Sequence, residues 1–341
     1  MPRSSSASSF YRAPLKASAL VLALAAATSA MAAENGNQRY SAGVGGSDMT
    51  TPVVPGLYFQ APMVAYHASK IKGNDGKQLT FLNPAAKVEI DTDTYAVLPR
   101  LSYISSHRLL GAHVGVTAML PIVKRKATFD VPALPNGHPI KTGVQGFTGS
   151  ETGVADLEVS PVMHWEIGDH QSVTFASTIV MPLGDFKADQ RVNAGFGDYY
   201  TFRPSVQYAF IGDGWDLGGR AVMSFNTRNK DTGYYSGKIF NFDWQAMAFV
   251  SEDIRVGVQG YFVRQLQADT LDSDGTVRNA QARMQLAGEQ GSKASVNAIG
   301  PAVAWLMNGG EMLIEGKFIK EFGAKNRTEG QAFWLTISKP L

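Results

Sequence analysis

The stretch MSFNTRNKDTGYYSGKIFNFDWQAMAFV, residues 223–250, alternates apolar and polar side chains on both sides of a polar loop. After the loop, the apolar Phe240, Phe242, Trp244, Ala246, Ala248 and Val250 alternate with the polar Asn241, Asp243 and Gln245. Successive side chains of a strand point to opposite faces, so this period of two predicts two strands, each with one apolar and one polar face. The fold depends on which face meets lipid and which meets water.

Two preceding segments show the same alternation. One has Phe202, Pro204, Val206, Tyr208 and Phe210 opposite Arg203, Ser205 and Gln207. The next has Trp215, Leu217, Ala221, Met223 and Phe225 opposite Asp216, Arg220, Ser224 and Asn226. A repeated period of two predicts an all-β chain.

The first 32 residues have the pattern of a signal peptide. Arg3, Arg12 and Lys16 precede the apolar run ASALVLALAAATSAMAA, which contains the small-residue cleavage pattern Ala30-Met31-Ala32. We therefore predict that residues 1–32 are removed on export. An uncleaved membrane helix is the alternative, but the run is alanine-rich and shorter than the roughly 20 residues that a span needs.

Removal of this segment changes the charge balance. The whole chain has 31 Lys and Arg against 29 Asp and Glu. Three basic residues and no acidic residue lie in the first 32, so the mature chain has 28 against 29. This balance lacks the excess of positive charge that binds nucleic-acid backbones, and we expect no nucleic-acid partner. The chain has no cysteine, so no disulfide stabilises it.

The connections between the predicted strands distinguish a membrane barrel from a soluble sandwich, whose strands also have one apolar face. Short connections are expected at 105–107, 168–169, 211–214, 251–253 and 307–310. Longer polar loops are expected at 70–91, 121–151, 184–199, 228–237 and 267–292. Strict alternation of short and long connections is typical of outer-membrane barrels, with turns in the periplasm and loops outside the cell.

We therefore predict a transmembrane antiparallel up-and-down β-barrel over residues 57–341, of about 12 strands. No stretch of the mature sequence approaches the 18 apolar residues of a spanning helix. The predicted strands are 57–68, 92–104, 109–120, 152–166, 170–183, 200–210, 214–227, 238–250, 254–266, 293–306, 311–323 and 328–339. The polar Asn241, Asp243 and Gln245 are then expected to face the lumen.

Four predicted strands carry a proline followed four residues later by an aromatic residue. The prolines are Pro99, Pro161, Pro204 and Pro301, and the aromatics are Tyr103, Trp165, Tyr208 and Trp305. We predict that these aromatics form a girdle on the lipid face near the short turns, with Tyr199-Tyr200 and Tyr234-Tyr235 in the opposite girdle. Proline cannot donate a ladder hydrogen bond, so each site is expected to have a bulge or an opened pair. Such sites either curve the wall or weaken it for sideways exit of an apolar solute.

Several segments resemble one known family. They are GluAsnGlyAsnGlnArgTyr (34–40), ValProGlyLeuTyr (54–58), GlyValAlaAspLeu (153–157), AsnThrArgAsnLysAspThrGlyTyrTyrSerGly (226–237), GlyValGlnGlyTyrPheValArgGlnLeu (257–266) and LysGluPheGlyAlaLysAsnArg (320–327). Together they resemble the family named "putative meta-pathway of phenol degradation" over nearly the whole mature chain. The resemblance implies an outer-membrane transport protein, with membrane lipid and a small hydrophobic or aromatic solute as partners. The barrel-assembly machinery is a further expected partner, during biogenesis.

Catalytic and metal-binding motifs were sought. Ser47, Ser150 and Ser236 lack the flanking glycines of a nucleophile elbow, and the six histidines do not form an HExxH motif. Ser160 and His164 share a strand face but lie about 13 Å apart, too far for a catalytic dyad. AspSerAspGly (272–275) and AsnAspGly (74–76) are incomplete calcium loops. We expect no catalytic residue, metal or cofactor, and therefore no enzyme.

Charged residues at polar-face positions are the candidate substrate-binding residues of the lumen. They are Arg100, Asp156, Glu158, Arg203, Arg220, Asp243, Arg255, Glu315 and Lys317. Both signs occur, which favours a mutually paired belt over an ion filter of one sign. The segment 33–56 is rich in glycine and has no strand pattern, so it is either a plug in the lumen or a periplasmic tail.

The sequence thus predicts a channel in the outer membrane of a Gram-negative cell, reached by export. Mainly on the family resemblance, its function is passive uptake of small hydrophobic or aromatic compounds, with a link to aromatic degradation by the phenol meta-pathway. A general small-solute porin is the main alternative. An outer-membrane enzyme or adhesin is the remaining one.

Overall fold

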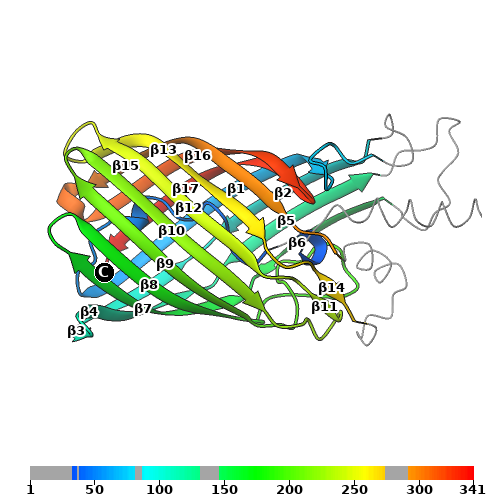
Figure 1. Cartoon of the computed structure of the whole chain (residues 1–341), viewed down its shortest axis with the longest axis horizontal. Helices are drawn as coiled ribbons and strands as arrows, with labels where there is room; N and C mark the ends of the chain where they lie inside the picture. The colour runs from blue at the N-terminus through cyan, green and yellow to red at the C-terminus, as the bar shows by residue number, and fades with distance from the viewer. Residues whose placement is uncertain (1–32, 37, 81–86, 131–145, 273–290) are drawn as a thin grey trace, which may run out of the picture.

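The structure, a computed structural model, describes residues 33–36, 38–80, 87–130, 146–272 and 291–341. They form an antiparallel β-barrel, in which a sheet of fifteen strand segments is closed by pairing of its first strand β1 with its last strand β17 (Figure 1). Nine segments are whole wall strands: β1 (Gly56–Lys72), β8 (Gln171–Met181), β9 (Thr201–Gly212), β10 (Trp215–Asn226), β12 (Ile239–Phe249), β13 (Ile254–Gln265), β15 (Ser295–Met307), β16 (Met312–Lys325) and β17 (Arg327–Pro340).

The other six segments form three wall strands, each broken in the middle. They are β2 (Glu89–Val97) with β3 (Arg100–Leu109), β4 (Ala112–Met119) with β5 (Ile122–Asp130), and β6 (Phe147–Val154) with β7 (Leu157–Ile167). The wall therefore has twelve strands, as predicted. β11 (Tyr234–Tyr235) and β14 (Thr270–Leu271) pair in a separate small sheet between two connections. The short turns lie at the end marked C in Figure 1, here called the short-turn end, and the longer connections lie at the opposite loop end.

Three short 3-10 helices complete the described chain: η1 (Glu34–Gly36), η2 (Ser47–Met49) and η3 (Asn308–Gly310). None of the helices in the described part of the chain is long and apolar enough to cross a membrane.

The alternation of side chains assigns the two faces as predicted. In β12, Asn241 and Asp243 are fully buried inside the barrel, as is Gln245 to within a few per cent. In β9, the side chain of Val206 on the outer face is 50% exposed. Tyr103, Tyr208 and Trp305 of the predicted girdle are also exposed on the outer face. The second predicted girdle is wrong for Tyr199 and Tyr234, because both are buried among the residues that hold the N-terminal segment.

Two predicted connections were misplaced, and one connection at the loop end is short. The expected loop 121–151 contains β5 and β6, and the expected turn at 105–107 lies inside β3, since the chain turns at residues 110–111. The turn between β16 and β17, at the loop end, is the single residue Asn326 with a φ of 50°. Short and long connections therefore do not alternate strictly.

The three strand breaks lie side by side. Val97 pairs with Ile122, and Ile122 pairs with Val154, so β2, β5 and β6 end at one level. Proline has no N–H group to donate, and the three prolines at this level accept through their carbonyl oxygens. Leu98 N donates to Pro62 O at 2.8 Å, Leu120 N to Pro99 O at 3.2 Å, and Ala155 N to Pro121 O at 2.8 Å. The local break in pairing predicted at Pro99 is confirmed as the gap between β2 and β3, and Pro62 and Pro121 lie at the same level of adjacent strands.

Pro161, Pro204 and Pro301 have a smaller effect. Next to each of them, ladder pairs with one neighbouring strand are missing, but the register continues without a shift. These sites have the locally opened pair that the sequence predicted, without a break in the strand.

Beyond the breaks, the wall also lacks a pairing. Among the described residues, β6 pairs only with β5, while β8 ends at Met181 beside Leu157 of β7. The connection 182–200 lies at this edge, where Asp185 donates its backbone N–H to Val154 and accepts from Val154 N at 2.9 Å through its side chain. This part of the wall is closed by a loop instead of a strand ladder.

Candidate transport pathway through the barrel

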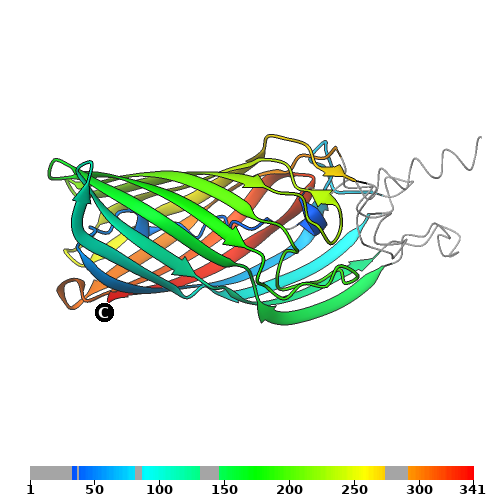
Figure 2. The same ribbon diagram turned by 90° about the horizontal axis from the view of Figure 1, so that it is seen from below.

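The N-terminal segment, residues 33–56, runs inside the barrel before it enters β1, as the blue trace in Figure 2 shows. Asp243 of β12 holds its middle. The carboxylate accepts from the Tyr40 hydroxyl at 2.6 Å and from the backbone N–H groups of Gly43 and Gly45, both at 3.0 Å. Three hydrogen bonds to one buried carboxylate fix the segment at this depth.

Ion pairs hold the segment above and below this point. Arg39 lies 2.7 Å from Asp156, with both side chains buried. Asp48 lies 3.0 Å from Arg220 and 3.4 Å from Arg100. Arg39 and Asp48 are therefore both neutralised by charges of the wall, which offsets the cost of removing these groups from water.

Glu315 and Lys317 of β16 contact the next part of the segment. Glu315 accepts from Ser47 N at 2.7 Å, and Lys317 Nζ donates to the Gly45 carbonyl at 2.6 Å. A Cβ atom on Gly46 would lie 2.1 Å from Glu315 Oε1, so any larger residue would displace the Glu315 carboxylate.

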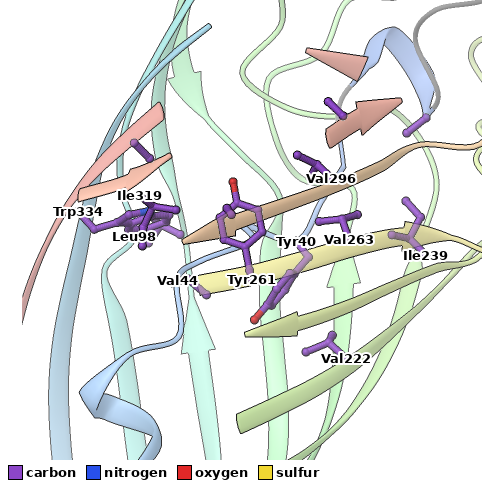
Figure 3. Close-up of a cluster of buried hydrophobic side chains, with 14 of the residues drawn as sticks. Tyr40, Val44, Leu98, Val222, Ile239, Tyr261, Val263, Val296, Ile319 and Trp334 are labelled. Carbon is purple, nitrogen blue, oxygen red and sulfur yellow. The ribbon is translucent and has the colours of Figure 1, made fainter. Parts of the chain in front are cut away.

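Apolar contacts accompany the polar ones on the other side of the segment. Tyr40 and Val44 pack with Tyr261, Val263 and Trp334 in a buried cluster inside the barrel (Figure 3). Burial of these side chains stabilises the seated segment without a directional bond.

All nine predicted lumen residues face inward and have a charged or hydrogen-bonded partner. Arg100, Asp156, Arg203, Arg220, Asp243, Glu315 and Lys317 contact the N-terminal segment. Arg203 also pairs with Glu158, and Arg255 pairs with Asp216. Mutual pairing within the nine is observed for Arg203 with Glu158 and for Lys317 with Glu315, while the others bond to the N-terminal segment or to Asp216. Contact of these residues with a substrate stays a prediction. The sequence did not single out Arg39 and Asp48 as partners, because both lie in a segment without strand pattern.

Three cavities lie between the N-terminal segment and the barrel wall. The loop-end cavity, the middle cavity and the short-turn-end cavity all touch Ser41. Thr94 and Arg125 line both the first and the second, and Leu98 and Glu158 line both the second and the third. The three cavities therefore follow one another along the same side of the segment.

The loop-end cavity has aromatic walls. The rings of Phe129 and Phe147 stack with centroids 5.8 Å apart, and the Arg191 guanidinium lies 5.1 Å from the Phe147 centroid. Tyr66 and Tyr261 line the opposite side, where their hydroxyls donate to Glu321 at 2.9 and 2.8 Å. Such walls offer flat apolar surface to a ring-shaped solute.

The middle cavity lies against the strand breaks. Its lining includes Ala96 and Leu98 at the first break, Pro121 at the second and Ala155 at the third. This cavity thus adjoins the level at which three neighbouring wall strands are broken.

The short-turn-end cavity is lined with hydroxyl groups. Ser160 Oγ lies 2.7 Å from Thr178 Oγ1, and His164 Nδ1 lies 2.8 Å from Thr174 Oγ1. Ser160 and His164 are therefore each bonded to the neighbouring strand, in agreement with a pore-lining row.

One group of potential metal ligands lies elsewhere. Ligand atoms of His67, Asp91 and Asp93 lie within 4.8 Å of one another. Asp91 and Asp93 alternate with Ile90, Thr92 and Thr94, which line the loop-end cavity, so the group is on the outer face. It has no part in the pathway.

Comparison with known proteins identifies the family. The model of the family described as "Putative MetA-pathway of phenol degradation" matches residues 68–337, most of the chain. The chain belongs to this family. The resemblance to this family, noted from the sequence motifs, is thereby confirmed. No curated protein sequence matches the chain.

Several solved structures are similar to this chain. The COG4313 outer membrane channel from Pseudomonas putida F1 has a TM-score of 0.66 at 10% identity, over 87% of this chain and 99% of that one. The TodX deltaS2S3 mutant monoaromatic hydrocarbon channel has a TM-score of 0.43 at 10% identity, over 85% and 91%. A FadL homologue of Pseudomonas aeruginosa has 0.39 at 8%, over 84% and 91%. The first likeness shows a shared fold, and the other two are too weak to inform function.

Proposed function

We propose that this protein is a channel in the outer membrane of Gram-negative cells that takes up small hydrophobic or aromatic compounds passively, without catalysis. The row of three cavities along one side of the N-terminal segment carries this proposal. A chain exported by a cleaved signal peptide and folded as an outer-membrane type of barrel would present the loop-end cavity to the outside.

The substrate class follows from the walls of the route. Aromatic rings surround the loop-end cavity, and apolar side chains such as Val64, Leu98 and Val123 line the middle one. Arg100, Asp156 and Arg220 on the cavity walls form ion pairs with the N-terminal segment, so they attract an ionic solute less than free charges would. The description of the family, phenol degradation, agrees with such a solute.

We infer that the solute leaves through the wall at the strand breaks. An apolar solute gains roughly 25 cal/mol for each Å² moved from water to hydrocarbon. The middle cavity adjoins breaks in three neighbouring strands, and the loop 182–200 closes the edge of β6 beyond them. Movement of this loop would join the cavity to the membrane, whereas the seated N-terminal segment obstructs the direct axial path.

A general small-solute porin is the second candidate. The hydroxyl-lined cavity at the short-turn end favours it, because Ser and Thr hydroxyls can replace the water around a polar solute. This function requires the N-terminal segment to move aside.

The test is to fill the middle cavity. Ala96→Phe places a ring in it, and Ala118→Phe places the same ring on the exposed outer face. Uptake of a labelled aromatic compound and of a small sugar is measured in porin-deficient cells that produce either variant. We expect Ala96→Phe to reduce aromatic uptake at least fivefold and Ala118→Phe to leave it unchanged. Normal aromatic uptake by Ala96→Phe, with the variant assembled at the normal level, would show that the route is wrong.

A further inference from the structure

A buried carboxylate at the loop end binds the start of the described chain. Asp269 is 1% exposed, and its two oxygens accept four hydrogen bonds. The donors are Ala33 N at 2.7 Å, the Tyr234 hydroxyl at 2.8 Å, Gly237 N at 2.7 Å and Gln265 Nε2 at 2.5 Å. The carboxylate is therefore saturated with donors, one of which is the nitrogen of Ala33.

All four donors are neutral as long as Ala33 is part of a peptide bond. Among the described residues, no Lys or Arg forms a salt bridge with Asp269 or with the neighbouring buried Glu34. The nearby Arg39 is committed to Asp156 and to the carbonyls of Gly197 and Tyr199. Within the described ranges of the chain, Glu34 Oε1 has no hydrogen-bond partner. Two buried carboxyl groups without a cation are costly, since isolated buried charges are normally paired.

We propose that the chain is cleaved between Ala32 and Ala33 and that the new α-ammonium group of Ala33 binds Asp269 as the cation of this pocket. In the cleavage, a signal peptidase hydrolyses the Ala32–Ala33 peptide bond with one molecule of water. Ala32 leaves with a carboxylate, and the amine of Ala33 takes up a proton. The sequence places a small-residue cleavage pattern at residues 30–32, directly before the nitrogen that the pocket holds.

The surroundings are organised around this nitrogen. The pairs Tyr234 with Leu271 and Tyr235 with Thr270 join the connections 228–237 and 267–272 into one small sheet. From these connections, Ser236 Oγ accepts from Glu34 N at 3.2 Å, and Asn229 Nδ2 donates to the Glu34 carboxylate at 2.8 Å. Burial raises the pKa of the Asp269 carboxyl, as expected for a site that lacks its cation.

The proposal makes cleavage part of the attachment of the N-terminal segment. With the ammonium bound, the segment is fastened at the loop end by Ala33 and at the short-turn end by its continuation into β1. An ammonium held by a buried carboxylate gives a stronger bond than an amide does. The attachment is independent of what the channel transports.

The test begins with the protein purified from outer membranes. Its intact mass should correspond to a chain that begins at Ala33, and any other first residue overturns the proposal. The α-amine is then acylated at neutral pH, and the modified fraction is followed by mass spectrometry. We expect the wild-type amine to react at least tenfold more slowly than in Asp269→Asn. The matched control Asp272→Asn removes an exposed carboxylate of the same connection and should react like the wild type.

A second chain guards against a folding defect in Asp269→Asn. One glycine inserted between Ala32 and Ala33, retained after cleavage, moves the ammonium out of register while Asp269 stays. We expect this chain to react as fast as Asp269→Asn. Equal acylation rates in the wild type and in the glycine-extended chain, with both barrels showing the heat-modifiable mobility of folded protein, overturn the proposal.

Discussion

Replacement of Asp243 by alanine should loosen the N-terminal segment without unfolding the barrel. The change removes the acceptor of the Tyr40 hydroxyl and of the Gly43 and Gly45 N–H groups. Hydrogen bonds to a charged group contribute about 1.5–3 kcal/mol each. The loss is offset in part because the desolvation cost of the buried carboxylate also disappears. We expect a net loss of about 3 kcal/mol in seating of the segment, which is roughly a hundredfold in its released population.

Hydrogen exchange measures this population. The informative amide is that of Ser47, because its acceptor is Glu315 and not Asp243. Its exchange should accelerate roughly a hundredfold in Asp243→Ala, and ion conductance of the reconstituted barrel should rise. Asp91→Ala, which removes an exposed carboxylate from the outer face, is the control and should change neither.

The reasoning is refuted if only the Gly43 and Gly45 amides exchange faster. Their own acceptor is gone, so they report a local loss. An unchanged rate at Ser47 would mean that the ion pairs of Arg39 and Asp48 hold the segment without help from Asp243.

Two further perturbations test the lipid face and the loop end. Val206→Arg, on the exposed outer face, should destabilise the barrel folded in lipid vesicles by about 2–4 kcal/mol if the site lies near mid-depth. Ser205→Arg, in the short-turn-end cavity, should be tolerated. Equal loss of stability of the two variants in urea titrations would contradict the assignment of faces. Burial raises the pKa of Glu34 from 4.5 to about 7, so in the glycine-extended chain its proton is bound more tightly when folded, and stability should fall as pH rises from 4.5 to 7. Glu34→Gln should reduce this fall of the urea midpoint with pH. An unchanged pH dependence in Glu34→Gln would be evidence against the role of Glu34.

The barrel could be predicted because its signal is local. Alternating side chains such as Phe242, Asp243 and Trp244 assign their own faces wherever a strand has lipid on one side. β5 lacked this signal: its outward Lys124 and Lys126 are polar, while Val123 and Ala127 face inward. Ser150 and Thr152 on β6 are likewise polar and exposed. The sequence of both strands therefore predicts a loop, and no strand break was predicted at Pro121.

The wall side of the candidate site could be predicted from the sequence, but the position of the N-terminal segment could not. The wall contributes Asp243, Glu315 and Lys317, which polar-face positions identify. Their partners lie in a glycine-rich segment whose position depends on contacts about 200 residues away in sequence, such as that of Gly43 with Asp243. No local pattern encodes such contacts, so plug and tail could not be distinguished. The cavities depend in turn on where that segment lies.

A reversible crosslink across the edge of β6 can test whether an apolar solute passes sideways through the wall. A Cβ atom on Gly153 would lie 3.1 Å from the Cβ of Asp185, near the spacing of about 3.5–4.5 Å in disulfides. The chain has no other cysteine, so Gly153→Cys with Asp185→Cys can fasten the loop 182–200 to β6. Uptake of a labelled aromatic compound is measured in cells before and after reduction. If the solute leaves sideways, the oxidised barrel loses aromatic uptake and regains it on reduction. Undiminished aromatic uptake with the disulfide formed would contradict it.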